Sequence, residues 1–296
     1  MAVSSFITYL ALEKNYSPHT VRAYERDLKE FASFCMEEYG FTSIDAVEYG
    51  IIRNWIVRLV DTGLSNRSVN RKIASLKAYY KFLLRIEKIQ RSPLAKHKSL
   101  KTAKKVEVPF SESEMERMFQ EVPFEENFEG IRDKLIIELL YTTGMRRSEL
   151  INLRMGDLDL NEKTIKVLGK RNKERIIPLL QSTLGMFERY FIVRGTLDNP
   201  KDDSFIFLSG TGHKIYETLV YRIINGYFSK VSSKVKKSPH ILRHTFATHL
   251  LNKGADLNSV KELLGHSSLA STQVYTHNSI AELKKVHSSA HPRSRD

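Results

Sequence analysis

The sequence predicts a mainly helical protein with a small β-sheet, built as an all-helical N-terminal domain followed by an α+β C-terminal domain. Three observations support this: apolar residues at helical spacing through the first hundred positions, a basic segment at residues 91–106, and two strand-like runs within residues 164–179. With 296 residues, the chain is long enough for two domains that each bury a core. We expect the domains at residues 1–90 and 108–296, joined by a linker at 91–107.

The N-terminal region shows three further helix signals after a first short apolar run. Glu13 and Lys14 close that run, and it lacks a basic start, so we expect an amphipathic helix and not a signal peptide. Ser17 and Pro18 form a typical helix start. One apolar stripe then follows at three- and four-residue steps: Val21, Tyr24, Leu28, Phe31 and Phe34. A second helix is expected over residues 51–59.

A third helix begins near Ser65 and separates apolar from basic residues. Its apolar stripe is Val69, Ile73, Leu76, Tyr80 and Leu83. Its other face carries basic and amide side chains, which suit contacts to phosphates and base edges. We expect these residues to contact DNA: Arg67, Asn70, Arg71, Lys72 and Lys77. A merely solvated face is the alternative for this helix taken alone.

The segment at residues 91–106 has no acidic residue until Glu107, and five lysines fall between Lys96 and Lys105. A flexible basic linker could follow a phosphate backbone while two domains close around a duplex. We therefore add Lys104 and Lys105 to the expected DNA contacts. A surface loop is the alternative interpretation.

The C-terminal domain opens with a capping box formed by Ser111 and Glu114. A long apolar helix then ends at Gly144. Residues 164–179 predict two strands joined by a polar turn, and residues 204–210 (SFIFLSG) predict a third strand. The pattern is helical again from Pro239, with glycine stops at Gly254 and Gly265.

Composition limits the possible partners. The net charge of +13 favours a polyanion, either nucleic acid or an anionic membrane surface. No stretch approaches the roughly 20 apolar residues of a membrane span, so we expect no membrane partner. The single cysteine, Cys35, is expected in the core, and the lack of any possible internal disulfide favours the cytoplasm.

Several segments of the C-terminal domain offer what breaking a phosphodiester without a metal requires. Two arginines can clamp nonbridging oxygens, because the guanidinium fork matches phosphate. A nucleophile must attack in line, and a proton donor must reach the leaving oxygen. His240 and Arg243 stand three residues apart and would share a helix face. The ordered set consists of Arg146, Lys170, His240, Arg243, His266 and Tyr275.

This ordered set resembles the tyrosine recombinase (phage integrase) family and is most similar to its Xer-type members. The matching motifs are TGMRRSEL, GKRNKER, HILRH, LGH and VYTH, and together they fill every position of the family order Arg, Lys, His-x-x-Arg, His, Tyr. The resemblance extends to the N-terminal helices and to the AHPR tail. It implies a SAM-like core-binding domain and a catalytic domain that form a C-shaped clamp on DNA.

The resemblance also implies roles. Tyr275 would be the nucleophile of a 3′-phosphotyrosyl link, and Lys170 the general acid. His240 would assist Tyr275, and His266 would hold a phosphate oxygen. Arg146 and Arg243 would stabilise the transition state, and Glu149 is expected to be structural and to support Arg146. We expect no cofactor or metal, and a homo- or hetero-tetramer on a double-stranded DNA recombination site.

Two positions depart from the family pattern. Arg147 follows Arg146 where relatives carry something smaller or apolar; the spacing to Gly144 favours Arg146 as the site arginine. Arg171 replaces a common glycine in the hairpin turn, so Asn172 is a candidate for positive φ and Lys173 is an alternative to Lys170.

The same residues are compatible with other functions. Only about a hundred residues precede the catalytic domain, which favours a simple recombinase, such as one that resolves chromosome dimers, with a possible protein activator. A mobile-element integrase without an extra N-terminal module is the alternative. A type IB topoisomerase is a second alternative, because it uses similar chemistry as a monomer. A C-terminal helix (residues 279–287) that docks on a neighbouring subunit would distinguish a recombinase from it. A catalytically silent DNA-binding protein is the third possibility.

Overall fold

The computed structural model describes residues 2–103, 107–169, 174–234, 236–265 and 277–295. The chain divides into two compact units, Met1–Lys105 and Val106–Asp296. In the described ranges, no helix is both long enough and apolar enough to cross a membrane.

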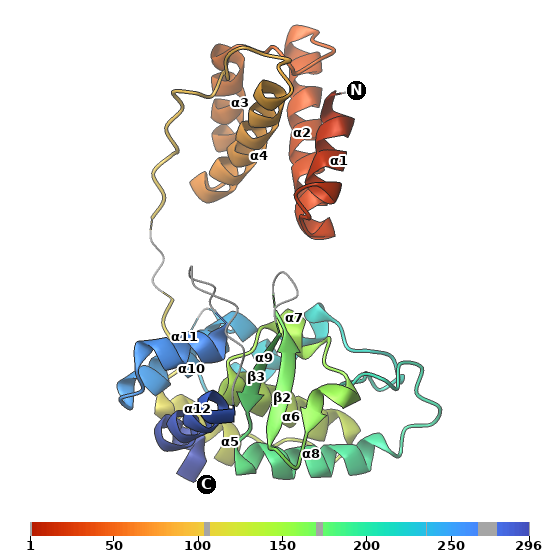
Figure 1. Ribbon diagram of the computed structural model, residues 1–296, viewed down its shortest axis with the longest axis vertical. Helices are drawn as coiled ribbons and strands as arrows, with labels where there is room; N and C mark the ends of the chain where they lie inside the picture. Colours follow the sequence, from red (N-terminus) through yellow and green to blue (C-terminus); the bar gives the residue numbers. More distant parts are fainter. Residues whose placement is uncertain (1, 104–106, 170–173, 235, 266–276, 296) are drawn as a thin grey trace. The chain divides into compact units, whose positions relative to one another are not determined.

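The first unit is entirely helical, as predicted (Figure 1). Its helices are α1 (Ala2–Leu12), α2 (Pro18–Tyr39), α3 (Tyr49–Asp61) and α4 (Asn66–Arg85). The Ser17 hydroxyl accepts a hydrogen bond from the amide of Thr20 at the start of α2, and Ser65 does the same for Ser68 in α4. The predicted apolar stripe of α4 is fully buried, and so is Cys35, whose thiol has its pKa raised to about 11 by burial.

The predicted linker is partly an extension of the first unit. The side-chain amide of Asn70 makes two hydrogen bonds to the backbone of Leu100, and Asn66 donates to the carbonyl oxygen of Lys101 at 2.8 Å. Lys77 donates to the carbonyl oxygen of His97. Residues 97–101 therefore run along α4 and are fixed to it, which the basic composition did not indicate.

The second unit combines helices with one small sheet (Figure 1). Its helices are α5 (Glu112–Gln120), α6 (Phe128–Thr143), α7 (Arg147–Leu150), α8 (Gln181–Arg194), α9 (Glu217–Phe228), α10 (Pro239–Asn252), α11 (Leu257–Leu264) and α12 (His277–Ala290), with 3₁₀ turns η1 (Met155–Asp157) and η3 (Pro292–Arg295). The predicted capping box of Ser111 and Glu114 is present at α5.

The sheet is antiparallel in the order β1 (Leu158–Asp159), β2 (Thr164–Leu168), β3 (Glu174–Pro178). The β2–β3 hairpin confirms two predicted strands, with Val167 opposite Arg175 and Leu168 opposite Glu174. The predicted strand at residues 204–210 is wrong. Only Phe205 and Leu208 of this segment form single bridges, to Arg154 and Lys214. No described strand lies beside the segment to continue the pairing.

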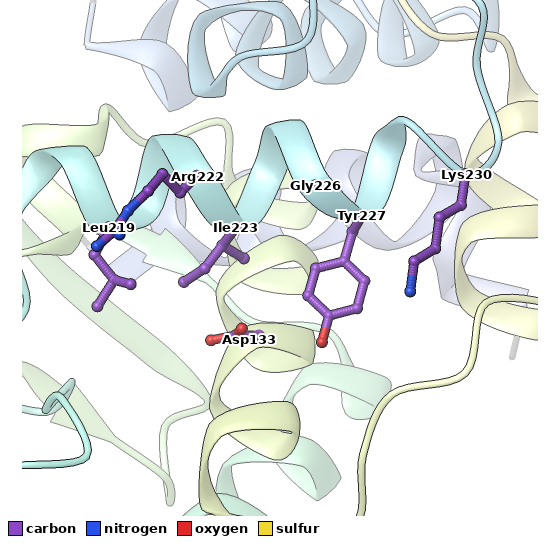
Figure 2. Close-up of a pocket in the computed structure, with 7 residues that line it drawn as sticks. All are labelled: Asp133, Leu219, Arg222, Ile223, Gly226, Tyr227 and Lys230. Atoms are coloured by element: carbon purple, nitrogen blue, oxygen red, sulfur yellow. The ribbon is translucent and has the colours of Figure 1, made fainter.

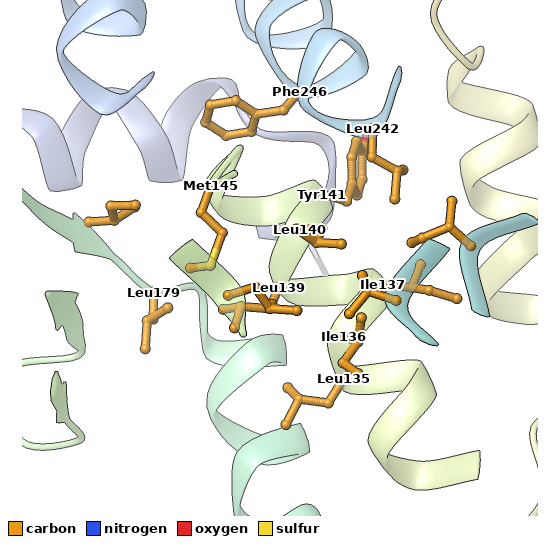
Figure 3. Packing of buried hydrophobic residues seen from close by; sticks show 14 of the residues in the cluster. Leu135, Ile136, Ile137, Leu139, Leu140, Tyr141, Met145, Leu179, Leu242 and Phe246 are labelled. Carbon is orange, nitrogen blue, oxygen red and sulfur yellow. The ribbon is translucent and has the colours of Figure 1, made fainter. Parts of the chain in front are cut away.

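Helix α6 lies at the centre of the second core. Its apolar residues point in several directions, and the helix packs mainly against α8 and α10 (Figure 3). The helix ends at Gly144, as predicted, in the left-handed region at φ 60°. A Cβ at this glycine would lie 2.3 Å from the ring of Phe246, so α6 and α10 approach more closely here than another residue would allow.

The C-terminal helix packs against the core of its own unit. Leu283 and Ala290 of α12 belong to the buried cluster around α6. His287 Nε2 bonds to the carbonyl oxygen of Thr142 at 2.6 Å, and His291 Nε2 bonds to that of Tyr141 at 3.2 Å. The last turn of α6 is thus covered by the tail of the chain.

Candidate functional site

Three of the six predicted site residues lie in the described part of the chain: Arg146, His240 and Arg243. The others, Lys170, His266 and Tyr275, lie outside the described residues, and so do Arg171, Asn172, Lys173, Lys104 and Lys105. The site can therefore be built from α6, α7, α10, α11 and β3.

Arg243 lies on α10, is 7% exposed, and connects the ends of two helices, α6 and α11. Its Nη1 donates to the carbonyl oxygen of Gly144 at 2.6 Å, and its Nη2 donates to that of Leu264 at 2.7 Å. Burial and the nearby guanidiniums of Arg146 and Arg175 lower its pKa to about 10. A buried cation beside other cations gains energy from any anion that enters.

Arg146 stands at the N-cap of α7, directly after the turn that ends α6. Its Nη1 donates to Glu149 Oε1 at 2.7 Å, and its backbone amide donates to Glu149 Oε2 at 2.7 Å. The side chain is about one-third exposed, so it is held by one carboxylate and still reaches the surface. Glu149 supports Arg146 in this structure, in the way that the sequence led us to expect.

Arg147, the alternative to Arg146, points elsewhere. Its guanidinium forms an ion pair with Glu217 at the start of α9. Arg146, in contrast, is close enough to Arg243 to depress its pKa. The geometry therefore supports Arg146 as the first site arginine.

The sequence interpretation missed Arg175, which is buried on β3 beside the two expected arginines. Its Nη1 and Nη2 donate to the two oxygens of Glu149, both at 2.9 Å, and its Nε donates to the carbonyl oxygen of Leu263 at 2.9 Å. Two signals were available. Arg175 is the last residue of the matching motif GKRNKER. In a strand it also shares a face with the buried Ile177, and a charged residue at an inward position calls for a buried partner.

The charges in this cluster do not balance. Three guanidiniums, those of Arg146, Arg175 and Arg243, gather around the carboxylate of Glu149. Burial alone would raise the pKa of Glu149, but its bonds to Arg175 and Arg146 hold that pKa below its usual value. Glu149 is therefore ionised, and the four groups together carry a positive excess that suits a phosphate.

His240 is the second residue of α10 and its side chain is 73% exposed. Its Nε2 lies 3.4 Å from Glu107 Oε2, and Glu107 also pairs with Lys236. The hydrogen bond from Lys236 is the main cause that lowers the pKa of Glu107. His240 is thus an accessible imidazole beside a carboxylate, one turn before Arg243.

The DNA contacts expected on α4 need one correction. Lys72 is not on the exposed face: it is buried, and its ammonium pairs with Asp27 and Glu30, because α2 covers this side of α4. Arg71 makes a two-point ion pair with Asp27 but keeps an exposed side. Asn70 and Lys77 bond to the segment at 97–101, as described above. Arg67 is exposed.

Other features of the second unit lie apart from this cluster. A cavity of about 430 Å³ lies between α6 and α9 and is lined by Asp133, Arg222, Tyr227 and neighbours, none of them a predicted site residue (Figure 2). Within the described ranges, no group of three or more histidine, cysteine, aspartate or glutamate side chains is arranged to hold a metal ion. Chemistry without a metal stays a prediction.

Comparison with known families identifies the class of protein. Residues 109–282 match the phage integrase family, and residues 3–87 match its N-terminal SAM-like domain. The chain belongs to this family: it is a tyrosine recombinase, an enzyme that cleaves and rejoins DNA.

Similar proteins extend over nearly the whole chain. The tyrosine recombinase XerC of Oceanobacillus iheyensis is 41% identical, with 99% of this chain and 96% of the relative covered. The tyrosine recombinase XerC of Chlorobaculum parvum is 39% identical, with 97% and 93% covered.

Solved structures share the fold. The Tn1549 transposon integrase in complex with transposon right end DNA has a TM-score of 0.72 at 22% identity, with 96% of this chain and 99% of that chain covered. XerH site-specific recombinase bound to palindromic difH substrate also has a TM-score of 0.72 at 22% identity, with 97% and 84% covered.

Proposed function

We propose that this tyrosine recombinase is an Xer-type enzyme that exchanges DNA strands at a specific site through a phosphotyrosine at Tyr275. The observation that carries the proposal is the cluster of Arg146, Arg175 and Arg243, in which Glu149 is the one carboxylate, so that a positive excess remains where the family motif predicts the scissile phosphate. Similarity to XerC proteins over nearly the full chain supports the subclass.

The chemistry is a transesterification. The Tyr275 oxygen attacks phosphorus and forms a 3′-phosphotyrosyl ester, while the bond to the 5′ oxygen breaks. Lys170 gives a proton to that leaving oxygen, and His240 assists removal of the phenol proton. Arg146 and Arg243 stabilise the charge that builds on the nonbridging oxygens, and His266 holds one of them. The reverse reaction with a new 5′ hydroxyl rejoins the strand without ATP.

The substrate is a double-stranded DNA site held by both units. The Tn1549 integrase and XerH, which share the fold, were solved with transposon right end DNA and with difH substrate, and the net charge of +13 supports a polyanionic partner. On the first unit, Arg67 and Arg71 are the exposed cations of α4 best suited to phosphate contact. We keep Asn70, Lys77, Lys104 and Lys105 as secondary candidates.

The cellular role that we propose is chromosome-dimer resolution through a Holliday junction. The enzyme would act as a homo- or hetero-tetramer on DNA, with an activator protein as a possible further partner. Integration or excision of a mobile element is the second candidate, and the similarity of fold to the Tn1549 integrase favours testing it.

Trapping of covalent complexes tests the function. DNA that is covalently linked to the protein in cells would be recovered after detergent denaturation and sequenced. A synthetic duplex with this sequence would then carry a nick beside the cleavage point, so that the short fragment released by cleavage diffuses away and religation is prevented. We expect wild type, with or without EDTA, to accumulate a 3′-linked complex, and Tyr275→Phe to form none. Cleavage by Tyr275→Phe, or inhibition by EDTA, would contradict the mechanism.

A second measurement separates a recombinase from a topoisomerase. A supercoiled plasmid with two copies of the recovered site would yield recombinant circles if strands are exchanged. Relaxation without recombinants would favour the topoisomerase interpretation.

A further inference from the structure

We infer that Arg175 is a positioning residue for strand cleavage: it fixes Glu149, and through it Arg146, and ties both to the end of α11. The inference deepens the proposed function and rests on it. Arg175 is the last residue of the matching segment GKRNKER but is not one of the six expected site residues, and the role inferred for it follows from its contacts.

The guanidinium of Arg175 is committed to protein atoms. Each of its three nitrogens donates a hydrogen bond of 2.9 Å, two to Glu149 and one to the carbonyl oxygen of Leu263. Its side chain is 4% exposed. A buried guanidinium held at three points has little freedom to turn toward DNA, so its effect on the reaction must pass through the groups that it holds.

Glu149 is the first of these groups. Each of its oxygens accepts one bond from Arg175 and one from Arg146: Oε1 from the Arg146 side chain and Oε2 from the Arg146 backbone amide. The orientation that Arg175 imposes on the carboxylate therefore sets both the main chain and the guanidinium of Arg146.

Arg175 also settles the charge available to a phosphate. The positive charge of Arg175 offsets the negative charge of Glu149. The positive charge of Arg146 therefore remains available to a phosphate, although Arg146 is hydrogen-bonded to Glu149. Without the Arg175 fork, Glu149 would be a buried carboxylate with Arg146 as its main partner, and the stronger pairing would draw Arg146 away from a phosphate.

The end of α11 is the second group. Arg175 bonds to the carbonyl oxygen of Leu263 and Arg243 bonds to the next one, that of Leu264. Cations suit the C-terminal end of a helix, where carbonyl groups lack helical partners. A Cβ at Gly265 would lie 3.0 Å from Arg175 Cδ, so the glycine that precedes His266 lies directly against this side chain. Two arginines thus hold the point from which the chain continues to His266 and Tyr275.

The test compares Arg175→Lys with a matched control, Arg132→Lys, in the full-length protein. Lysine keeps the charge but cannot bond both Glu149 oxygens and the Leu263 carbonyl at once. Arg132 is equally buried on α6, where it bonds to Asp133 and to the carbonyl oxygen of Leu208. Both variants would be assayed at a temperature at which unfolding curves show them folded. The probe is the nicked duplex rebuilt from covalent complexes.

We expect Arg175→Lys to slow single-turnover formation of the covalent complex by about 10-fold to about 100-fold, the scale of a small misplacement of a reacting group. Its affinity for the duplex at fixed salt should stay at the wild-type level. Arg132→Lys should lose stability but keep the wild-type rate. Equal slowing in both variants would show a general effect of a weakened fold and overturn the inference.

A double-mutant cycle with Glu149→Gln compares the rates of covalent-complex formation in the single and double variants, and it distinguishes coupling through Glu149 from a merely structural role. If Arg175 acts through Glu149, the double variant should be no slower than the slower single variant. Independent, multiplying losses would overturn the coupling. A wild-type protein that traps no DNA would remove the proposed function itself, whereas wild-type cleavage with an equally fast Arg175→Lys would remove only this inference.

Discussion

Arg243 and Gly144 are joined by a hydrogen bond of 2.6 Å between the guanidinium Nη1 and the carbonyl oxygen, across 99 residues of sequence. The bond connects α10 to the end of α6 at Gly144, which stands two residues before Arg146 in the sequence. The same guanidinium reaches Leu264 at the end of α11. One side chain of α10 therefore contacts the end of α6, just before Arg146, and the end of α11, just before the LGH motif is completed by His266.

Arg243→Lys should separate binding from cleavage. An ammonium keeps the positive charge but cannot span the carbonyl oxygens of Gly144 and Leu264 while it faces a phosphate. We expect single-turnover cleavage to fall by about 10²-fold to 10³-fold, the usual effect of losing one donor to a transition-state oxygen. Retention of the duplex in a gel-shift assay should be unchanged. Weaker binding with normal cleavage of the bound fraction would contradict the assignment.

Gly144→Ala should destabilise the second unit by about 2 to 4 kcal/mol. The new Cβ would meet the Phe246 ring at 2.3 Å, and φ of 60° is unfavourable for alanine. Urea unfolding followed by circular dichroism measures the change. The control is Gly226→Ala within α9, where a Cβ has no neighbour within 4 Å and should be neutral or slightly stabilising. Equal stability of the two variants would show that the close approach of α6 and α10 is unimportant.

Arg67 and Lys72 should respond differently to removal although both are cations of α4. Arg67→Ala should weaken DNA binding at every sequence and reduce the slope of log affinity against log salt by about 1. Lys72→Ala should leave that slope unchanged but cost the first unit about 3 kcal/mol, because Asp27 is buried beside it. A reduced slope for Lys72→Ala would instead place its ammonium on DNA.

Acid should loosen the C-terminal helix. Burial lowers the pKa of His287 to about 4, so below the ordinary value of 6.5 the unfolded chain takes up a proton that the folded chain refuses. Stability from this group is complete above pH 6.5 and declines as the pH falls toward 4, by up to about 3 kcal/mol.

His287→Gln isolates this contribution. Glutamine keeps an Nε2 donor for the Thr142 carbonyl but does not titrate. The difference in unfolding free energy between wild type and variant should shrink or change sign as pH falls from 7 to 4, since the carboxylates titrate alike in both. Parallel curves across this range would show that the imidazole is not the group responsible.

Much of the fold was predictable because it depends on local periodicity and caps. The α4 stripe that includes Val69 and Leu83, and the start of α2 at Ser17, follow from spacing and residue type alone. The conformation of residues 204–210 was not predictable in this way, since a strand needs a neighbouring strand and the sequence does not say which segment runs beside it. The prediction that Lys72 contacts DNA was wrong for a related reason: α2 covers that side of α4, and its partner Asp27 lies 45 positions away in the sequence.

The site was predictable where a motif names its residues and hidden where it depends on pairing across the fold. Arg146 and Arg243 stand in recognisable sequence patterns, and the structure brings them together. Arg175 also ends a recognisable pattern, GKRNKER, but its role became visible only through its partners, Glu149 on α7 and the Leu263 carbonyl on α11. The alternation of residues along β3 predicted that the side chain at this position faces inward, but it could not identify the buried carboxylate that pairs with it.

The contact between the tail and α6 has a consequence for how the protein is made. During synthesis, the carbonyl oxygens of Tyr141 and Thr142 emerge from the ribosome well before His287 and His291, the groups that cover them. Leu283 and Ala290, which complete the same core, emerge equally late. The nascent second unit therefore cannot close its interior until residues 283–291 have been synthesised, whereas the first unit has all of its helices long before then.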